Sequence, residues 1–212
     1  MATTKRPVPY VWCSWLTKVL AGEAACLYQP WLKSQFKYDK RPDSNFNLAA
    51  WTAEHTALVN ARAAELRSDG WAVTLEGQNN FKLYGKSAVL AGQPDIIAVR
   101  DGVTLVVDGK TGQQRHADWF QVLIYMLVVP RVKEHLTNLR GEVCYKDHRI
   151  AVEPEELTPA LAEQIYALLR TMGESTRPPT SLSQHDCGWC DIADCKDRYV
   201  DAGASVAVAA EF

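Results

Sequence analysis

The chain has 212 residues, of which 47% are hydrophobic and 23% charged, and its formal net charge is −2 at pH 7. This length suits one domain with appendages, and the composition excludes a disordered or fibrous chain. No run of about 18 apolar residues occurs and the N-terminus lacks the features of a signal peptide, so we expect a cytoplasmic protein without membrane contact.

The N-terminal part is predicted to form a helical arm. Ser14 is a suitable N-cap for a short helix over residues 15–21, which stops near Gly22. Residues 23–38 read as a second helix, interrupted at Pro30.

One long amphipathic helix is predicted over residues 48–69, with Gly70 as its C-terminal stop. Its inward face also carries His55, whose polar ring needs a partner there. A core histidine bonded to a backbone carbonyl and a functional histidine both remain open. The apolar residues on this face are Trp51, Leu58, Val59 and Leu66.

The sequence period then changes from helical to extended. The dipeptide Asp101-Gly102 is a strong hairpin signal between the last two of five short runs, so we expect a mostly antiparallel sheet. These runs, rich in β-branched and aromatic residues, are 71–76, 80–84, 87–92, 95–100 and 103–109.

The remaining elements alternate between helix and strand. Residues 116–129 are apolar enough for a helix packed on the sheet and ended by Pro130, and residues 141–152 predict a further hairpin. Thr158 is the expected N-cap of a last helix ending before Gly173. The order indicates an α/β fold. The expected parts of one domain, 1–212, are the arm (14–47), the core (48–172), a cysteine segment (173–200) and a tail (201–212).

Two acids and a lysine are expected to meet at strand ends. Alternation along residues 103–110 places Asp108 and Lys110 on one face, and the hairpin brings Asp95 close to Asp108. Neighbouring carboxylates repel unless a divalent cation or a shared proton stabilises them, and oxygen ligands favour Mg²⁺ or Mn²⁺. Simple turn and strand-end roles remain the alternative.

A glutamine and a tyrosine on the following helix extend this group. Gln121 and Tyr125 are one turn apart, so both can face the same edge of the sheet. They can hold a substrate phosphate or Lys110, or form a structural buried pair.

A basic stripe is predicted on the arm. If the second helix extends far enough, four basic residues follow one face and can attract nucleic acid, with a solvated face as the alternative. The nearby Trp31 and Phe36 can stack unpaired bases or join the core. The basic residues are Lys33, Lys37, Lys40 and Arg41.

A dense cysteine cluster is predicted to bind metal. Cys187, Cys190 and Cys195 have the spacing C-x2-C-x4-C, which is typical of thiolate ligation. A closed zinc site or a cubane iron–sulfur cluster needs a fourth ligand. The candidates for it are Cys26, Cys13 and Cys144.

Taken together, "AGQPD" (91–95), "VDGK" (107–110) and "QVLIY" (121–125) resemble the core of the PD-(D/E)XK nucleases. The last motif is characteristic of their RecB-like branch. With His55 upstream and the cysteines split between the two ends, residues 14 to 200 are similar to the iron–sulfur nucleases of that branch. Those are the CRISPR-associated exonuclease of spacer acquisition and the AddB-type repair nucleases.

The resemblance implies a restriction-endonuclease-like core, a central mixed sheet flanked by helices, and roles for the motif residues. Lys110 is the catalytic lysine, and Gln121 and Tyr125 support the active site and DNA. The implied ligands of a catalytic Mg²⁺ or Mn²⁺ are His55, Asp95, Asp108 and the carbonyl of Gly109.

The resemblance also selects the fourth cysteine. It implies that Cys26 joins Cys187, Cys190 and Cys195 around a [4Fe–4S] cluster, with Zn²⁺ as the alternative. Such a cluster would close a very long loop and act mainly as a structural staple.

We therefore expect a metal-dependent DNA exonuclease, acting on single-stranded DNA or DNA ends in CRISPR spacer acquisition or DNA repair. CRISPR integrase or helicase subunits are the partners that the resemblance implies. The alternative is a non-catalytic module that binds nucleic acid or protein on a nuclease fold stapled by zinc or an iron–sulfur cluster.

Overall fold

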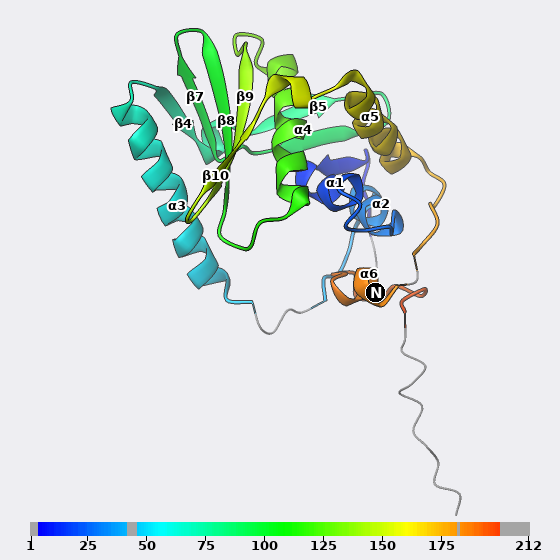
Figure 1. The fold of residues 1–212 in the computed structure, drawn as a ribbon. Helices are drawn as coiled ribbons and strands as arrows, with labels where there is room; N and C mark the ends of the chain where they lie inside the picture. Colours follow the sequence, from blue (N-terminus) through cyan, green and yellow to red (C-terminus); the bar gives the residue numbers. More distant parts are fainter. Residues whose placement is uncertain (1–3, 42–45, 182, 200–212) are drawn as a thin grey trace, which may run out of the picture.

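A five-stranded mixed sheet forms the centre of the computed structural model, which describes residues 4–41, 46–181 and 183–199 (Figure 1). The strand order is β10-β9-β8-β7-β4. The strands are β4 (Ala72–Leu75), β7 (Ile96–Arg100), β8 (Val103–Lys110), β9 (Leu139–Tyr145) and β10 (Arg149–Val152).

The hairpin predicted at Asp101-Gly102 is confirmed. Strands β7 and β8 pair antiparallel, and both turn residues have positive φ, 50° for Asp101 and 76° for Gly102, as a two-residue hairpin turn requires. Strands β8 and β9 are parallel, so the chain must cross over between them, and helix α4 (His116–Val132) provides that connection.

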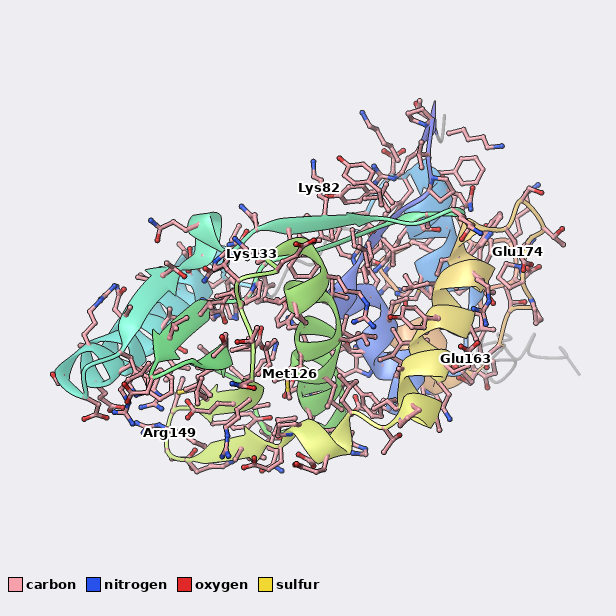
Figure 2. All side chains as sticks on the ribbon, turned by 90° about the horizontal axis from the view of Figure 1, so that it is seen from above. Lys82, Met126, Lys133, Arg149, Glu163 and Glu174 are labelled. Carbon is pink, nitrogen blue, oxygen red and sulfur yellow. The ribbon has the colours of Figure 1, made fainter. Side chains whose placement is uncertain are left out.

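Helices cover both faces of this sheet. Helix α3 (Leu48–Ser68) packs on one face, where Val59 and Leu66 contact the Ile96 and Val107 side of the sheet. Helix α4 packs on the other face and is covered in turn by α1 (Cys13–Leu20), against which α5 (Pro159–Gly173) packs (Figures 1 and 2). Enclosure on two sides explains why residues 122–129 of α4 form one continuous buried apolar run.

A second, three-stranded sheet has the order β2-β6-β5. Its central strand β6 (Val89–Gly92) pairs parallel with β2 (Tyr10–Trp12) and antiparallel with β5 (Phe81–Tyr84). The expectation that all central strands share one sheet was therefore wrong, because β6 finds its partner in an N-terminal strand that has little local signal. A short pair joins β1 (Thr4–Lys5) to β3 (Phe36–Lys37).

The arm differs from its prediction. Helix α1 begins at Cys13, with Ser14 inside it, and α2 (Tyr28–Gln35) includes Pro30 in its first turn, where the missing N–H is tolerated. The chain becomes extended at Phe36, so the helical basic stripe does not exist. Lys33 instead forms an ion pair with Asp191 at 2.8 Å.

The structure also decides between the two alternatives for Trp31 of the arm, a stacking position and a core position. Trp31 is buried and donates a hydrogen bond from Nε1 to the carbonyl of Glu174, so it belongs to the core.

The ends of two later helices were predicted with mixed success. Helix α4 continues two residues past Pro130, where it was expected to end, whereas Thr158 caps α5 as predicted. The remaining short helices are η1 (Glu76–Gln78), η2 (Pro154–Glu156) and α6 (Gln184–Gly188). Within the described ranges, no helix combines the length and apolar character needed to cross a membrane.

The contact between β9 and α4 gives a test of this packing. A Cβ at Gly141 would fall on Val122 and lie 2.8 Å from Met126 Sδ, so Gly141→Ala forces the helix away from the sheet. We expect a loss of about 1–3 kcal/mol in the free energy of unfolding, measured by urea denaturation. Gly77→Ala, where a Cβ meets nothing within 4 Å, is the control and should not be destabilised. Equal stability of the two variants would contradict this packing.

Candidate functional site

Polar side chains from four elements meet at one edge of the central sheet. Their cavity has a volume of about 550 Å³ and lies where β7 begins and β8 ends, between α3 and α4. The residues that line it include His55, Glu76, Asp95, Asp108, Lys110 and Gln121. The structure therefore brings most of the predicted site residues to one place.

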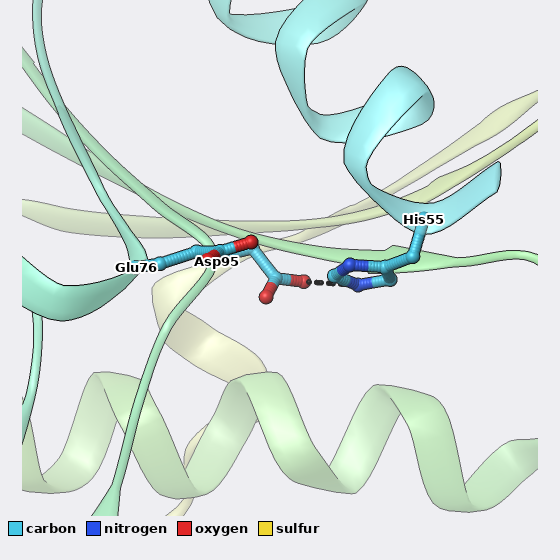
Figure 3. A group of neighbouring side chains, drawn as sticks. All are labelled: His55, Glu76 and Asp95. Carbon is cyan, nitrogen blue, oxygen red and sulfur yellow. Dashed lines mark hydrogen bonds and ion pairs between the residues drawn. The ribbon is translucent and has the colours of Figure 1, made fainter. Parts of the chain in front are cut away.

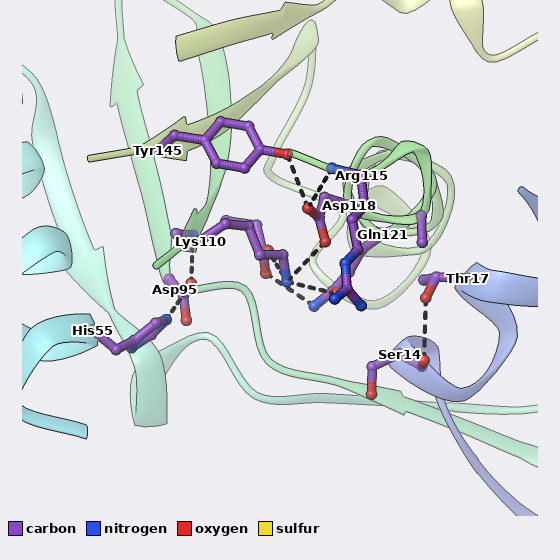
Figure 4. Close-up of polar contacts among 12 residues, drawn as sticks. Ser14, Thr17, His55, Asp95, Lys110, Arg115, Asp118, Gln121 and Tyr145 are labelled. Atoms are coloured by element: carbon purple, nitrogen blue, oxygen red, sulfur yellow. Dashed lines mark hydrogen bonds and ion pairs between the residues drawn. The ribbon is translucent and has the colours of Figure 1, made fainter. Parts of the chain in front are cut away.

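Asp95 is held from two sides. Its Oδ2 accepts a hydrogen bond from the backbone N–H of Gly109 at 2.7 Å and lies 3.2 Å from Nε2 of His55 (Figures 3 and 4). This bond to Asp95 raises the pKa of His55, although burial opposes the shift. His55 thus has a carboxylate as its partner and not a backbone carbonyl.

Glu76 is a site residue that sequence reasoning missed. One donor atom from each of His55, Glu76 and Asp95 lies within 4.8 Å of the other two, a grouping that can hold a metal ion (Figure 3). Strand β4 pairs with β7 so that Leu75 lies opposite Ile96, and the next pair at that end is Glu76 and Asp95. An acid at the last position of the predicted strand 71–76 was the available signal.

The backbone of Glu76 is unusual. Its φ is +29°, a value that residues with a side chain rarely adopt. The N–H of Glu76 donates to the carbonyl of Asp95 at 2.9 Å, and the N–H of Asn79 donates to the carbonyl of Glu76 at 2.7 Å. Strained conformations of this kind concentrate at functional sites.

A hydrogen-bonded network connects Asp108 to α4. Gln121 donates from Nε2 to Asp108 Oδ1 at 2.9 Å and to the Tyr125 hydroxyl at 2.8 Å. Its Oε1 accepts from Lys110 Nζ at 3.0 Å (Figure 4). Tyr125 donates in turn to the carbonyl of Gln93 at 3.3 Å. Gln121 therefore holds Asp108, Lys110 and Tyr125 in fixed relative positions.

Asp108 is compensated by charge as well as by a hydrogen bond. It is only 2% exposed, and its Oδ2 lies 2.7 Å from Lys110 Nζ in an ion pair, while its Oδ1 accepts from Gln121. Burial raises the pKa of Asp108 to about 6, while the Lys110 ammonium acts in the opposite direction. Burial also lowers the pKa of Lys110, but the attraction of Asp108 outweighs it and the net shift is upward.

Gly109 adjoins these groups closely. A Cβ there would lie 3.2 Å from Val59, 3.5 Å from Asp95 Oδ2 and 3.6 Å from His55 Nε2. A side chain larger than alanine would press on Asp95 and His55, so this position suits glycine. The carboxylates of Asp95 and Asp108 and the imidazole of His55 line one cavity, and this donor set fits a divalent cation such as Mn²⁺ or Mg²⁺.

A second cavity collects four of the six cysteines. Cys26, from the loop before α2, lines it together with Cys187, Cys190 and Cys195. Burial raises the pKa of Cys190 and of Cys195, so a bound metal would be needed to hold them as thiolates. The other two cysteines, Cys13 and Cys144, are buried in the two apolar clusters of the fold.

Protein contacts already join the N-terminal arm to the cysteine segment. The Asp191 carboxylate accepts hydrogen bonds from Tyr38 at 2.7 Å and Gln29 at 3.2 Å, and pairs with Lys33. The backbone of Arg41 also donates to the carbonyl of Asp191 at 2.7 Å. Lys33 therefore serves this junction and is not free for a nucleic acid.

Comparisons with known proteins place the fold in a family. The family model of the PD-(D/E)XK nuclease superfamily matches residues 17–195. No curated protein sequence matches the chain. A solved structure titled "Crystal structure of SSO0001" is similar at 13% identity and a TM-score of 0.43, over 87% of this chain and 84% of that one. Because the family model spans most of the sequence, this chain belongs to the PD-(D/E)XK nuclease superfamily.

Proposed function

We propose that this protein is a DNA exonuclease that acts on single-stranded DNA or DNA ends. Membership in the superfamily indicates a metal-dependent nuclease that hydrolyses phosphodiester bonds. The observation that carries the proposal is the buried Asp108 carboxylate, paired with Lys110 in the cavity that also contains His55 and Asp95.

Four groups are proposed to hold the catalytic Mg²⁺ or Mn²⁺: His55, Asp95, Asp108 and the carbonyl of Gly109, with Glu76 as an addition from the structure. An imidazole among carboxylates suits Mn²⁺ at least as well as Mg²⁺. When bound, the cation supplies charge neutralisation at a phosphate oxygen and a lower pKa for a coordinated water.

Lys110 is proposed as the catalytic lysine. Its ammonium group is fixed by Asp108 and Gln121 at the wall of the cavity, so it can orient the attacking water and stabilise negative charge on the phosphate. The water oxygen bonds to phosphorus, the bond from phosphorus to a sugar oxygen breaks, and that oxygen takes up a proton. Gln121 and Tyr125 are proposed as the residues that keep Lys110 and Asp108 in place.

Digestion of end-labelled DNA by Lys110→Ala tests this role. Wild type should release nucleotides from single-stranded DNA with Mn²⁺ but not with EDTA, and the variant should be slower by about 100-fold or more, because it lacks the fixed cation. Lys82→Ala, which changes an exposed lysine of β5 (Figure 2), should match wild type.

A catalytic site and a non-catalytic binding module predict different results in this digestion assay. If Lys110→Ala digests DNA at the wild-type rate, the catalytic assignment is wrong. If wild type is inert with every metal but binds DNA, the non-catalytic binding module becomes the better account.

Replacing Glu76 separates the two possible ligand sets. Glu76→Gln should weaken Mn²⁺ binding by at least about tenfold in calorimetry, because attraction between a carboxylate and a nearby divalent cation exceeds the 1.4 kcal/mol that tenfold represents. Glu54→Gln, which removes an exposed carboxylate paired with Lys146, is the matched control. If Glu76→Gln binds Mn²⁺ as tightly as wild type, Glu76 is not a ligand and the set is His55, Asp95, Asp108 and the carbonyl of Gly109.

We further propose that Cys26, Cys187, Cys190 and Cys195 hold a [4Fe–4S] cluster of the RecB-like iron–sulfur type, with Zn²⁺ as the alternative. The support from the structure is that all four cysteines line one cavity. Pathway and partners, CRISPR spacer acquisition or DNA repair with integrase or helicase subunits, are supported by the motif resemblance alone.

Iron content and colour test the cluster. Protein purified without oxygen should contain about four irons per chain and absorb near roughly 400 nm, and Cys195→Ser should lose both. Cys144→Ala, at a buried cysteine outside the cavity, should keep them. A colourless wild type with one zinc would support the zinc alternative, and metal-free protein would exclude both.

A further inference from the structure

Aromatic rings lead from the surface to the cation site. Trp51 and His55 are one turn apart on α3, and their rings stack with centroids 5.1 Å apart and planes 21° apart. Phe46 lies beside Trp51, with a centroid distance of 6.2 Å and a tilt of 48°. His55 is itself a proposed cation ligand and contacts Asp95, so Trp51 stacks directly on one of the proposed ligands.

Neither outer ring belongs to the core. Trp51 is 42% exposed and Phe46 is 52% exposed, while the buried face of α3 is formed by Val59, Ala63 and Leu66. The expectation that Trp51 lies on the buried face was therefore wrong. Large exposed aromatic side chains that adjoin a polar cavity are typical of binding surfaces.

Trp51 also lines the cavity that contains the acids and the lysine. A flat ligand stacked on Trp51 would thus sit at the same opening as Asp108 and Lys110. Tryptophan suits this purpose because its ring offers a large π face to any base, independent of sequence.

We propose that Trp51, flanked by Phe46, stacks an unpaired base next to the scissile phosphate and thereby selects strands with unpaired bases. This inference rests on the proposed nuclease function of the same cavity. In a duplex the base faces are covered by their neighbours, so a base must leave the stack before it reaches Trp51, and that costs free energy. A single strand avoids most of this cost.

Abasic substrates test the contact directly. The substrates are single-stranded oligonucleotides with one abasic residue moved stepwise from the end, together with an intact strand and an intact duplex. Rates of DNA cleavage are measured in Mn²⁺, and affinities for the same DNA are measured in Ca²⁺. The proteins compared are wild type, Trp51→Ala, Trp51→Phe and a control, Tyr84→Ala. Tyr84 is 75% exposed on β5 and lies outside the lining of the cavity.

We expect Trp51→Ala to lose between about fivefold and 150-fold in affinity or rate on the intact single strand, the range of one base–aromatic stack. One abasic position should weaken wild type by a similar factor and have no further effect on Trp51→Ala. Trp51→Phe should keep most of the activity, and Tyr84→Ala all of it.

Independent effects, in which the abasic residue slows Trp51→Ala as much as wild type at every position, would overturn the inference. They would show that Trp51 only supports His55. The inference would also be overturned if wild type cleaves DNA and Trp51→Ala cleaves it equally well. The nuclease function would then still stand. A third outcome is that no protein cleaves DNA, while the abasic residue and Trp51→Ala weaken DNA binding in Ca²⁺ without adding to each other. That outcome would support the stacking site and contradict the nuclease function.

Discussion

The burial of Asp108 is the constraint on which the rest of the site depends. A carboxylate at 2% exposure is unfavourable unless charge and hydrogen bonds compensate for the lost water. Lys110 provides the charge, and Gln121 provides the hydrogen bond to one oxygen. Because Gln121 is on α4, the packing of that helix against β8 and β9 determines whether the compensation is available.

The same constraint explains the arrangement on the other side of the strand. The backbone N–H of Gly109 holds Asp95, which in turn orients His55 from α3. Asp95 therefore contacts α3 through His55, whereas Asp108 contacts α4 through Gln121. This geometry keeps both carboxylates in one cavity, with Asp95 paired to His55 and Asp108 paired to Lys110. Such an arrangement is expected at a site that binds a cation.

The cysteine segment depends on a separate set of contacts. Asp191 accepts hydrogen bonds from Gln29 and Tyr38 and pairs with Lys33, so the two ends of the sequence meet through protein contacts. The proposed cluster would reinforce this junction. It would not be its sole basis, so loss of the cluster need not unfold the sheet.

Features with local signals were predictable from sequence. The Asp101-Gly102 hairpin, the Thr158 cap and the apolar run of α4 depend on residues close in the chain, and all three are present. The motif order also identified the superfamily, because its acids, lysine and glutamine are ordered along one hairpin and the next helix.

Features that depend on distant partners were not predictable. Glu76 approaches Asp95 only because β4 pairs with β7 in one register, and β2 reads as a strand only beside β6. The basic stripe was wrong because the chain becomes extended at Phe36, where it pairs with β1, and Lys33 pairs with Asp191 near the other end of the chain. Trp51 is likewise exposed because the buried residues of α3, Val59, Ala63 and Leu66, all lie in its C-terminal half.

Anomalous scattering from crystals soaked in Mn²⁺ would show whether a cation binds between the side chains of His55, Asp95 and Asp108. We expect a peak in the cavity, about 2.0 to 2.3 Å from oxygens of Asp95 and Asp108 and from a nitrogen of His55, and no such peak for Asp108→Asn. A DNA-cleaving wild type whose crystals show no peak between these residues would contradict this expectation.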